Sequence, residues 1–234
     1  MDFENTLIKG TLIKRYKRFL ADVQLADGEI VTAHCANSGS MMSLIEEGAE
    51  VYMSPNTNPK AKLDWRWEMI RVNGGLVGIN TSRPNYIVED GILDGTIKEL
   101  SGYENLRREV KYGTNSRIDI LLEKPMKPSC YVEVKNCTLS KKEGIVEFPD
   151  GVTARGTKHL GELSDMINEG HRAVMVYLVN RADCHTFKIA KDIDSIYYTA
   201  FLKAIDNGVE VYAYCVDINE KGISVATQID ICKE

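Results

Sequence analysis

The sequence lacks paired cysteines, long apolar runs and an excess of positive charge. Its six cysteines stand apart from one another, and none forms a Cys-x-x-Cys pair. Several lie inside apolar, strand-like runs such as VYAYCVDI. This spacing argues against both a zinc knuckle and a disulfide framework. We therefore expect buried free thiols in a reducing compartment and no disulfide-linked partner.

No apolar run approaches the roughly 20 residues that a membrane-spanning helix needs. The first residues, MDFENTLIKG, are acidic where a signal peptide would have a basic region followed by an apolar one. We therefore expect a cytoplasmic protein with no membrane partner. With 44% hydrophobic and 27% charged residues, the chain of 234 residues has an ordinary globular composition and enough apolar mass for a core.

The net charge of −5 does not by itself indicate a nucleic-acid partner. Local clustering is more informative, because the run RYKRFL interleaves Arg15, Lys17 and Arg18 with the aromatic rings of Tyr16 and Phe19. Such a strand can meet phosphates with its cations and stack a base on an aromatic side chain. The alternative is a solvated strand edge. We take Arg15, Tyr16, Lys17 and Arg18 as candidate nucleic-acid-binding residues.

Residues 1–85 resemble a small β-barrel. The segment LIKGTLIKRYKRFLADVQLADGEIVTAHC contains short strand-like runs, with a hairpin turn at Asp27-Gly28. A short helix is expected over MMSLIEEG, followed by strands in AEVYMSP, DWRWEMIRVN and LVGIN. About five short strands and one helix fit an OB-like barrel.

Residues 86–234 have a mixed α and β pattern. A capping box at Ser101–Glu104 predicts a helix that carries Leu106 and Val110 inward and ends at Gly113. SRIDILLE and CYVEVKN alternate as a hairpin should, and GIVEFP is expected as a third strand. ARGTKHLGELSDMINEG predicts an amphipathic helix, and AVMVYLVN a central strand. The order α-β-β-β-α-β predicts a mixed central sheet flanked by helices, within an overall α+β class.

Two carboxylates and one ammonium fall on the predicted hairpin. Period-2 alternation places Glu133 and Lys135 on one face of their strand, and pairing of the two strands brings Asp119 close to them. Charges among packed apolar neighbours are costly unless they pair or bind a metal. One or two carboxylates with several waters suit Mg²⁺ or Mn²⁺. The Lys135 ammonium could position an attacking water or stabilise charge on a phosphate.

Asp119 followed by Glu133-Val134-Lys135 resembles the signature of the PD-(D/E)XK nucleases, without the leading proline. The strings GTNSRIDILL, YVEVKNCTL, FPDGVTARGTKHLGEL and RYKRFLADV are similar to the sugar fermentation stimulation protein A (SfsA) family over essentially the whole chain. One departure is Ala36-Asn37, where Pro-Asn is expected. This resemblance implies DNA as the partner, an N-terminal OB-like barrel and a C-terminal nuclease-like domain.

Further candidates flank the hairpin. Glu109 is a candidate metal ligand, although a surface glutamate paired with a base would also explain it. Arg155, His159 and Glu162 share one stripe of the helix that begins near residue 154, with Lys158 beside them. We take Arg155 and Lys158 as candidate phosphate ligands and His159 as a candidate proton-transfer residue. The alternative is a solvated stripe.

Three functions remain open from the sequence. The first is a Mg²⁺-dependent DNA phosphodiesterase using Asp119, Glu133, Lys135 and His159. The second is a non-cleaving DNA-binding regulatory protein linked to sugar metabolism. The third is a metal enzyme acting on a small phosphorylated substrate, which is disfavoured because no Gly-rich phosphate loop is present. The sequence also leaves a homo-oligomer open.

Overall fold

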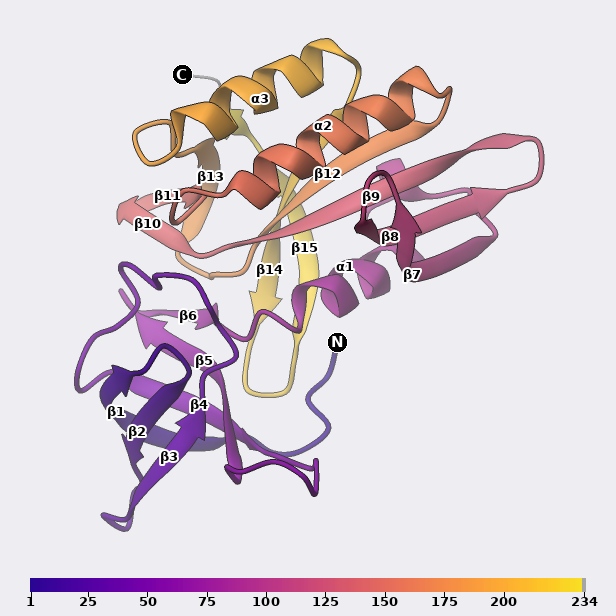
Figure 1. The fold of residues 1–234 in the computed structure, drawn as a ribbon. Helices are drawn as coiled ribbons and strands as arrows, with labels where there is room; N and C mark the ends of the chain where they lie inside the picture. Colours follow the sequence, from indigo (N-terminus) through magenta and orange to yellow (C-terminus); the bar gives the residue numbers. More distant parts are fainter. Residues whose placement is uncertain (233–234) are drawn as a thin grey trace.

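The computed structural model describes residues 1–232, which form a β-barrel followed by a larger α/β unit (Figure 1). The barrel sheet has the strand order β3-β2-β1-β4-β5-β6, and an additional pairing of β3 with β5 closes it. The predicted OB-like barrel is therefore confirmed. Its strands are β1 (Ile8–Tyr16), β2 (Leu20–Gln24), β3 (Ile30–His34), β4 (Glu50–Pro55), β5 (Trp65–Val72) and β6 (Gly75–Gly78).

The barrel closes around a core of alternate side chains from its strands. Val23, Trp67 and Ile70 are completely buried there, and Gly28 adopts a φ of 91° in the predicted turn between β2 and β3. The helix expected over residues 41–48 is wrong, because this segment forms turns. Met41 and Ser43 have φ values of 52° and 69°, in a left-handed region that an α-helix does not use.

The α/β unit is built on a six-stranded mixed sheet with the order β15-β14-β12-β9-β8-β7. β12 runs parallel to both β9 and β14, and the other neighbours are antiparallel. A separate four-stranded sheet has the order β10-β11-β13-β16. The elements are α1 (Pro84–Leu93), η1 (Lys98–Leu100), β7 (Asn105–Tyr112), β8 (Ser116–Lys124), β9 (Lys127–Cys137), β10 (Leu139–Lys142), β11 (Gly144–Phe148), α2 (Ala154–Asn168), β12 (Arg172–Val179), β13 (Cys184–Ile189), α3 (Ser195–Asp206), β14 (Glu210–Ile218), β15 (Ile223–Ile229) and β16 (Ile231–Cys232).

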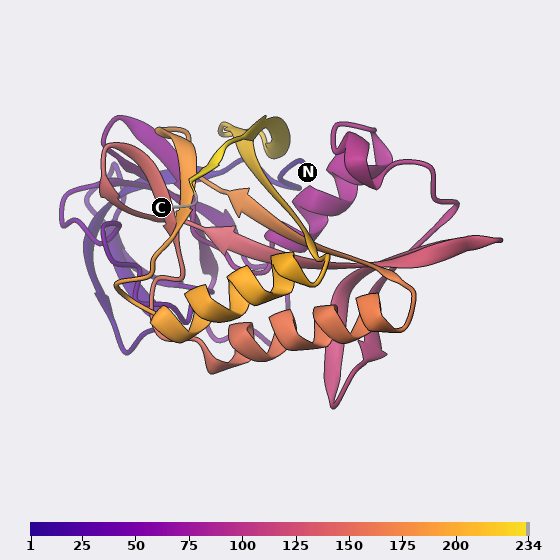
Figure 2. The same cartoon turned by 90° about the horizontal axis from the view of Figure 1, so that it is seen from above.

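The helices cover both faces of the six-stranded sheet. α2 and α3 lie side by side on one face, and α1 lies on the other (Figure 2). The strand β12 has no charged residue after Arg172 and supplies alternate residues to both layers, with Val174 and Val176 toward α1 and Met175 and Tyr177 toward α2. This confirms the prediction of a central strand. In the described residues, no helix is both long and apolar enough to cross a membrane.

The helix expected between Ser101 and Gly113 is wrong, because this segment forms the edge strand β7. Leu106 and Val110 fit helical spacing, but they also fit period-2 alternation, with Arg107 and Glu109 exposed between them. Hydrogen-bonded pairing with β8 along the length of β7 favours the strand over the helix. The main-sheet strands and their helices therefore run α1-β7-β8-β9-α2-β12, with β7 in place of the expected helix and GIVEFP outside this sheet.

Two other expectations change in the structure. The segment GIVEFP forms β11, but it pairs with β10 and β13 in the separate sheet, outside the main one. The cysteines were expected to be buried free thiols; all six are free, but only four are buried, while Cys215 is half-buried and Cys232 is exposed.

Backbone pairing joins the barrel to the α/β unit. β6 meets the segment after β12, where Val77 pairs with Arg181 and the Gly78 amide donates to the Asn180 carbonyl at 2.9 Å. A Cβ at Gly78 would lie 2.6 Å from Nδ2 of Asn180. The Asn180 side chain is buried and donates from Nδ2 to Oδ1 of Asn136, so it has little freedom to move.

We expect Gly78→Ala to destabilise the protein, because the methyl group overpacks this junction at a cost of roughly 1–3 kcal/mol. Gly161→Ala is the matched control, since a Cβ there has no neighbour within 4 Å and lies on the exposed side of α2. That change should stabilise slightly through helix propensity. Thermal melting of both variants checks the prediction, and an unchanged melting temperature for Gly78→Ala would contradict it.

Candidate active site

The ladder between β8 and β9 ends beside Asp119. The last regular pair on this side is Ile120 with Val132. Beyond it, the Val134 amide donates to Oδ2 of Asp119 at 2.8 Å, so a side-chain carboxylate takes the place of a strand carbonyl. The two strands therefore separate here, and polar groups face one another at the split.

A residue of α1 also holds the Asp119 carboxylate, in addition to the Val134 amide. The Asn85 side chain donates from Nδ2 to Oδ1 of Asp119 at 2.9 Å. Asn85 directly follows Pro84 at the start of α1, a position that suits proline because its missing N–H is not needed there. Both carboxylate oxygens of Asp119 thus have one donor each, and their orientation is fixed.

Glu133 and Lys135 lie together on the α2 side of β9, as the alternation predicts. The Lys135 ammonium donates to Oε1 of Glu133 at 2.6 Å. Glu133 is only 2% exposed, and its other oxygen, Oε2, has no hydrogen-bond partner among the described residues. A buried carboxylate oxygen without a partner is costly, so this atom is suited to receive a ligand.

His159 reaches the same carboxylate from α2. Its Nδ1 contacts Oε1 of Glu133, and the exposed Arg155 donates to its Nε2 at 3.4 Å. An accepting Nε2 places the proton on Nδ1, which lets the neutral ring donate to Glu133. The helix that brings both residues begins at its predicted place, with Thr153 accepting a hydrogen bond from the Gly156 amide.

The two carboxylates differ in their electrostatic environment. Burial, reinforced by the nearby charge of Glu133, raises the pKa of Asp119 to about 6. Burial also acts to raise the pKa of Glu133, but the hydrogen bond from His159 and the charge of Lys135 outweigh it, so that pKa lies below its usual value. Glu133 is therefore ionised near neutral pH, while Asp119 gains a proton in mildly acidic solution.

Two predicted site residues lie away from the carboxylates. Glu109 lies on β7 between the paired residues Arg108 and Val110, in a left-handed conformation with φ of 54°. Its side chain is exposed and makes no hydrogen bond within residues 1–232. Lys158 braces the turn between β7 and β8 through Ser116 Oγ at 3.1 Å and pairs with Glu162 at 3.4 Å.

The barrel cluster divides into two groups. Arg15 donates to four backbone carbonyls, three of them in the loop Asn37–Ser40, and Tyr16 donates to Asp22. Lys17 and Arg18 form the exposed β1–β2 turn and make no ion pair within the described part of the chain. The guanidinium of Arg15 thus holds a loop, and the next two cations face solvent.

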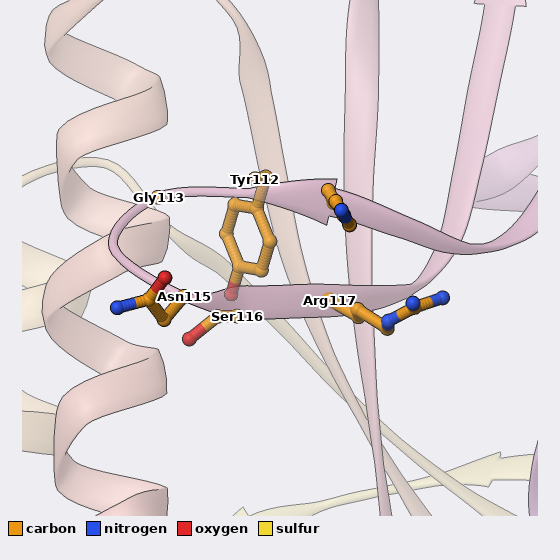
Figure 3. Close-up of a pocket in the computed structure, with 6 residues that line it drawn as sticks. Tyr112, Gly113, Asn115, Ser116 and Arg117 are labelled. Atoms are coloured by element: carbon orange, nitrogen blue, oxygen red, sulfur yellow. The ribbon is translucent and has the colours of Figure 1, made fainter.

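Sequence patterns did not indicate two residues near the site, Asn85 and Tyr112. Tyr112 extends from β7 toward Ser116 on β8, beside a cavity of about 420 Å³ that is also lined by Arg117 (Figure 3). It is 8% exposed, and its hydroxyl has no partner in the described residues. Burial, followed by the charges of Glu133, Glu162 and Asp119, raises the pKa of Tyr112, so its hydroxyl remains a donor. Period-2 alternation over residues 105–112, together with pairing to β8, would have placed Tyr112 here.

The donor set fits a cation that prefers oxygen ligands. Asp119 presents two oriented oxygens, and Glu133 has one buried oxygen without a partner. Mg²⁺ and Mn²⁺ need one or two carboxylates and retain several waters. Within residues 1–232, no cluster of three or more His, Cys, Asp or Glu side chains is arranged around a metal-sized space. An all-protein cage is therefore not present in this part of the chain.

Comparisons with known proteins cover both units. The sugar fermentation stimulation protein RE domain matches residues 82–222, and the SfsA N-terminal OB domain matches residues 13–79. Sugar fermentation stimulation protein homologues from Paramagnetospirillum magneticum and Rhodospirillum centenum are each 52% identical to this chain. The alignments cover 98% and 96% of the chain, and 97% of each relative.

A solved structure has the same fold. SfsA of Pyrococcus furiosus, described in complex with Ca²⁺, superposes with a TM-score of 0.88 at 24% sequence identity, over 99% of this chain and 97% of that one. Together with the matched domains and the relatives at 52% identity, this fold leads to one conclusion. The chain belongs to the sugar fermentation stimulation protein family.

Proposed function

We propose that this protein is a divalent-metal-dependent nuclease that hydrolyses phosphodiester bonds in DNA. The observation that carries this function is the meeting of Asp119, Glu133 and Lys135 at the point where β8 and β9 separate. A protein that only bound DNA would have no use for a buried and a half-buried carboxylate, Glu133 and Asp119, at a surface that meets an anionic ligand. The family resemblance supports DNA as the substrate.

Asp119 and Glu133 would hold the cation. A bound Mg²⁺ or Mn²⁺ supplies Lewis acidity toward the phosphate and lowers the pKa of bound water. The Ca²⁺ in the Pyrococcus furiosus relative is also a cation that prefers oxygen ligands, which supports this choice of metal class. Asn85 and the Val134 amide fix the Asp119 carboxylate in one orientation.

Lys135 and His159 have different roles in this proposal. Lys135 is 14% exposed and lies within reach of a substrate, where its ammonium can orient the attacking water or neutralise charge on the phosphate. His159 is 4% exposed and lies behind Glu133, so it acts by orienting this carboxylate. Arg155, exposed and next to His159, is the better placed of the two helix cations for a phosphate.

One observation favours the non-cleaving alternative. Oε1 of Glu133 already receives both Lys135 and His159, so part of the carboxylate is neutralised without a metal. An inactive nuclease-like site that kept this arrangement for stability would bind DNA without cleaving it. Activity of single variants separates the two functions.

The metal site should depend on pH through Asp119. Because its pKa is raised to about 6, this carboxyl holds a proton below that pH, and a cation must displace the proton to bind. Mn²⁺ affinity measured by calorimetry should therefore fall by up to about tenfold per pH unit below pH 6 and level off above it. Asp119→Asn should lose most of the affinity at every pH.

Asp192→Asn is the control for the metal measurement, since Asp192 is exposed and pairs with Lys141 away from the centre. It should bind Mn²⁺ as the wild type does. Equal Mn²⁺ affinity in the wild type and in Asp119→Asn would remove Asp119 from the metal site.

Lys135→Ala should abolish most cleavage of DNA while leaving Mn²⁺ and DNA affinity nearly unchanged. A charge that acts mainly in the transition state lowers turnover rather than binding. Gel assays of DNA cutting with Mg²⁺ or Mn²⁺ measure the turnover, and Lys142→Ala, an exposed lysine on β10, serves as the control.

If Lys135 were only the structural partner of Glu133, its removal would leave a buried carboxylate with His159 alone. The loss would then appear as lower thermal stability, on the order of 3–5 kcal/mol. Wild-type cutting by a stable Lys135→Ala protein would remove the lysine from the mechanism.

The barrel turn should contribute to DNA binding through charge. DNA affinity should fall steeply with salt, and Lys17→Ala/Arg18→Ala should reduce the slope of log affinity against log salt by about 2, with an unchanged melting temperature. Arg15→Ala should instead lower the melting temperature, because carbonyls of the Asn37–Ser40 loop lose their donor. Fluorescence anisotropy over a salt series provides the measurement. An unchanged slope in the double variant would shift the DNA-binding face toward Arg155.

A further inference from the structure

A second cavity lies on the barrel, away from the carboxylates, and has a volume of about 540 Å³. Leu20, His34 and Arg66 form its floor as neighbours across three strands, because Leu20 pairs with His34 and His34 pairs with Arg66. The loop between β4 and β5 forms its wall with Ala61 and Leu63. We call this cavity the barrel pocket. Its size lies within the range of small-ligand sites.

The wall of the barrel pocket is preformed. The Asn56 side chain donates to the Leu63 carbonyl at 3.2 Å, and the Ala61 amide donates to the Asn58 carbonyl at 2.9 Å. These hydrogen bonds close the loop on itself without help from a ligand. Binding there would cost little ordering of the chain.

The His34 ring lines the barrel pocket, and Phe19, which precedes the lining residue Leu20, packs against that ring. The Phe19 and His34 rings are stacked, with their centroids 6.5 Å apart and their planes at 25°. Phe19 is 44% exposed, although a large apolar side chain is usually covered. A flat ligand that enters the barrel pocket can therefore stack on aromatic and apolar surface.

Four cations lie in or next to this region: Lys62 and Arg66 line the barrel pocket, and Lys17 and Arg18 directly precede Phe19 in the β1–β2 turn. None of them forms an ion pair within residues 1–232. Lys17 and Arg18 also adopt left-handed φ values of 46° and 66°, which cost of order 1 kcal/mol for residues other than glycine. The turn thus holds two exposed positive charges at a conformational cost. The charged residues that line the barrel pocket, Lys62 and Arg66, are positive as well.

We infer that the barrel pocket binds an unpaired nucleobase of single-stranded DNA, with the flanking phosphates on the surrounding cations. A base provides a flat face for stacking, and its backbone provides the negative charge that the four cations require. A base inside a duplex is stacked on both faces and paired at its edge, so it cannot enter. The ligand class rests on the proposed function, and the inference adds that the substrate has a single-stranded segment.

Fluorescence anisotropy in EDTA tests this inference, because no cutting occurs without a metal. Two labelled probes are used, a thymidylate 12-mer and a 12-mer of the same backbone length whose nucleotides are abasic. The wild type should bind the thymidylate probe roughly 5-fold to 100-fold more tightly, as expected for base stacking. Equal affinity for the two probes would overturn the inference, as would binding of duplex DNA alone.

Two double variants separate the base from the phosphates. Phe19→Ala/Leu63→Ala should lower thymidylate affinity to the abasic level and leave abasic binding unchanged. Lys62→Ala/Arg66→Ala should lower the affinity for both probes by the same factor. Lys98→Ala/Lys203→Ala, an equal charge change on the α/β unit, should leave both affinities unchanged. Phe19 and Leu63 lie outside the barrel core, so both variants should fold, which melting curves verify.

The inference and the proposed function can fail separately. A protein that cuts DNA through Lys135 but binds both probes equally keeps the nuclease function and loses the base site. A protein that binds thymidylate through Phe19 and Leu63 but never cuts keeps the base site and loses the nuclease. If Phe19→Ala/Leu63→Ala weakens both probes alike, the apolar wall does not contact a base, and the inference is wrong.

Discussion

The hydrogen bond from the Val134 amide to the Asp119 carboxylate is the interaction on which the rest of the site depends. It ends the β8–β9 ladder and holds Asp119 at the split. The same split leaves Glu133 buried beside the Lys135 ammonium, with one carboxylate oxygen that has no partner among residues 1–232. An unpaired buried oxygen carries a local cost, and in the proposed function a bound cation would relieve it.

Contacts between the two units fix the barrel relative to this split. β6 pairs with the segment after β12, and Ser40 Oγ donates to the Asp150 carbonyl at 3.0 Å. Within the barrel, Arg15 holds the loop Asn37–Ser40 from which Ser40 makes this contact. Asp150 lies shortly before α2, the helix that carries His159, so the segment that leaves the barrel pocket at His34 continues into a loop that docks beside the start of α2. A strand held in the barrel pocket would meet a site whose position is already set.

Sequence patterns predicted the parts of the protein in which local and tertiary preferences agree. Alternation in β9 placed Glu133 and Lys135 together, and the apolar spacing of ARGTKHLGELSDMINEG predicted the helix α2. They failed at β7, because Leu106 and Val110 fit both periods and only the β8 partner decides. Asn85 could not be found from local spacing, since it reaches the site through a long-range contact, and Tyr112 is placed there only once β7 is paired with β8. The strained turns at Met41 and Lys17 also break local rules.

The central claim is that Asp119 and Glu133 share one divalent cation. Anomalous diffraction from crystals soaked in Mn²⁺ locates that cation directly. The account predicts a single strong peak within coordination distance of an Asp119 oxygen and of Oε2 of Glu133, and its loss in Asp119→Asn crystals. A peak elsewhere, or no peak here with Lys135 still paired to Glu133, would contradict it.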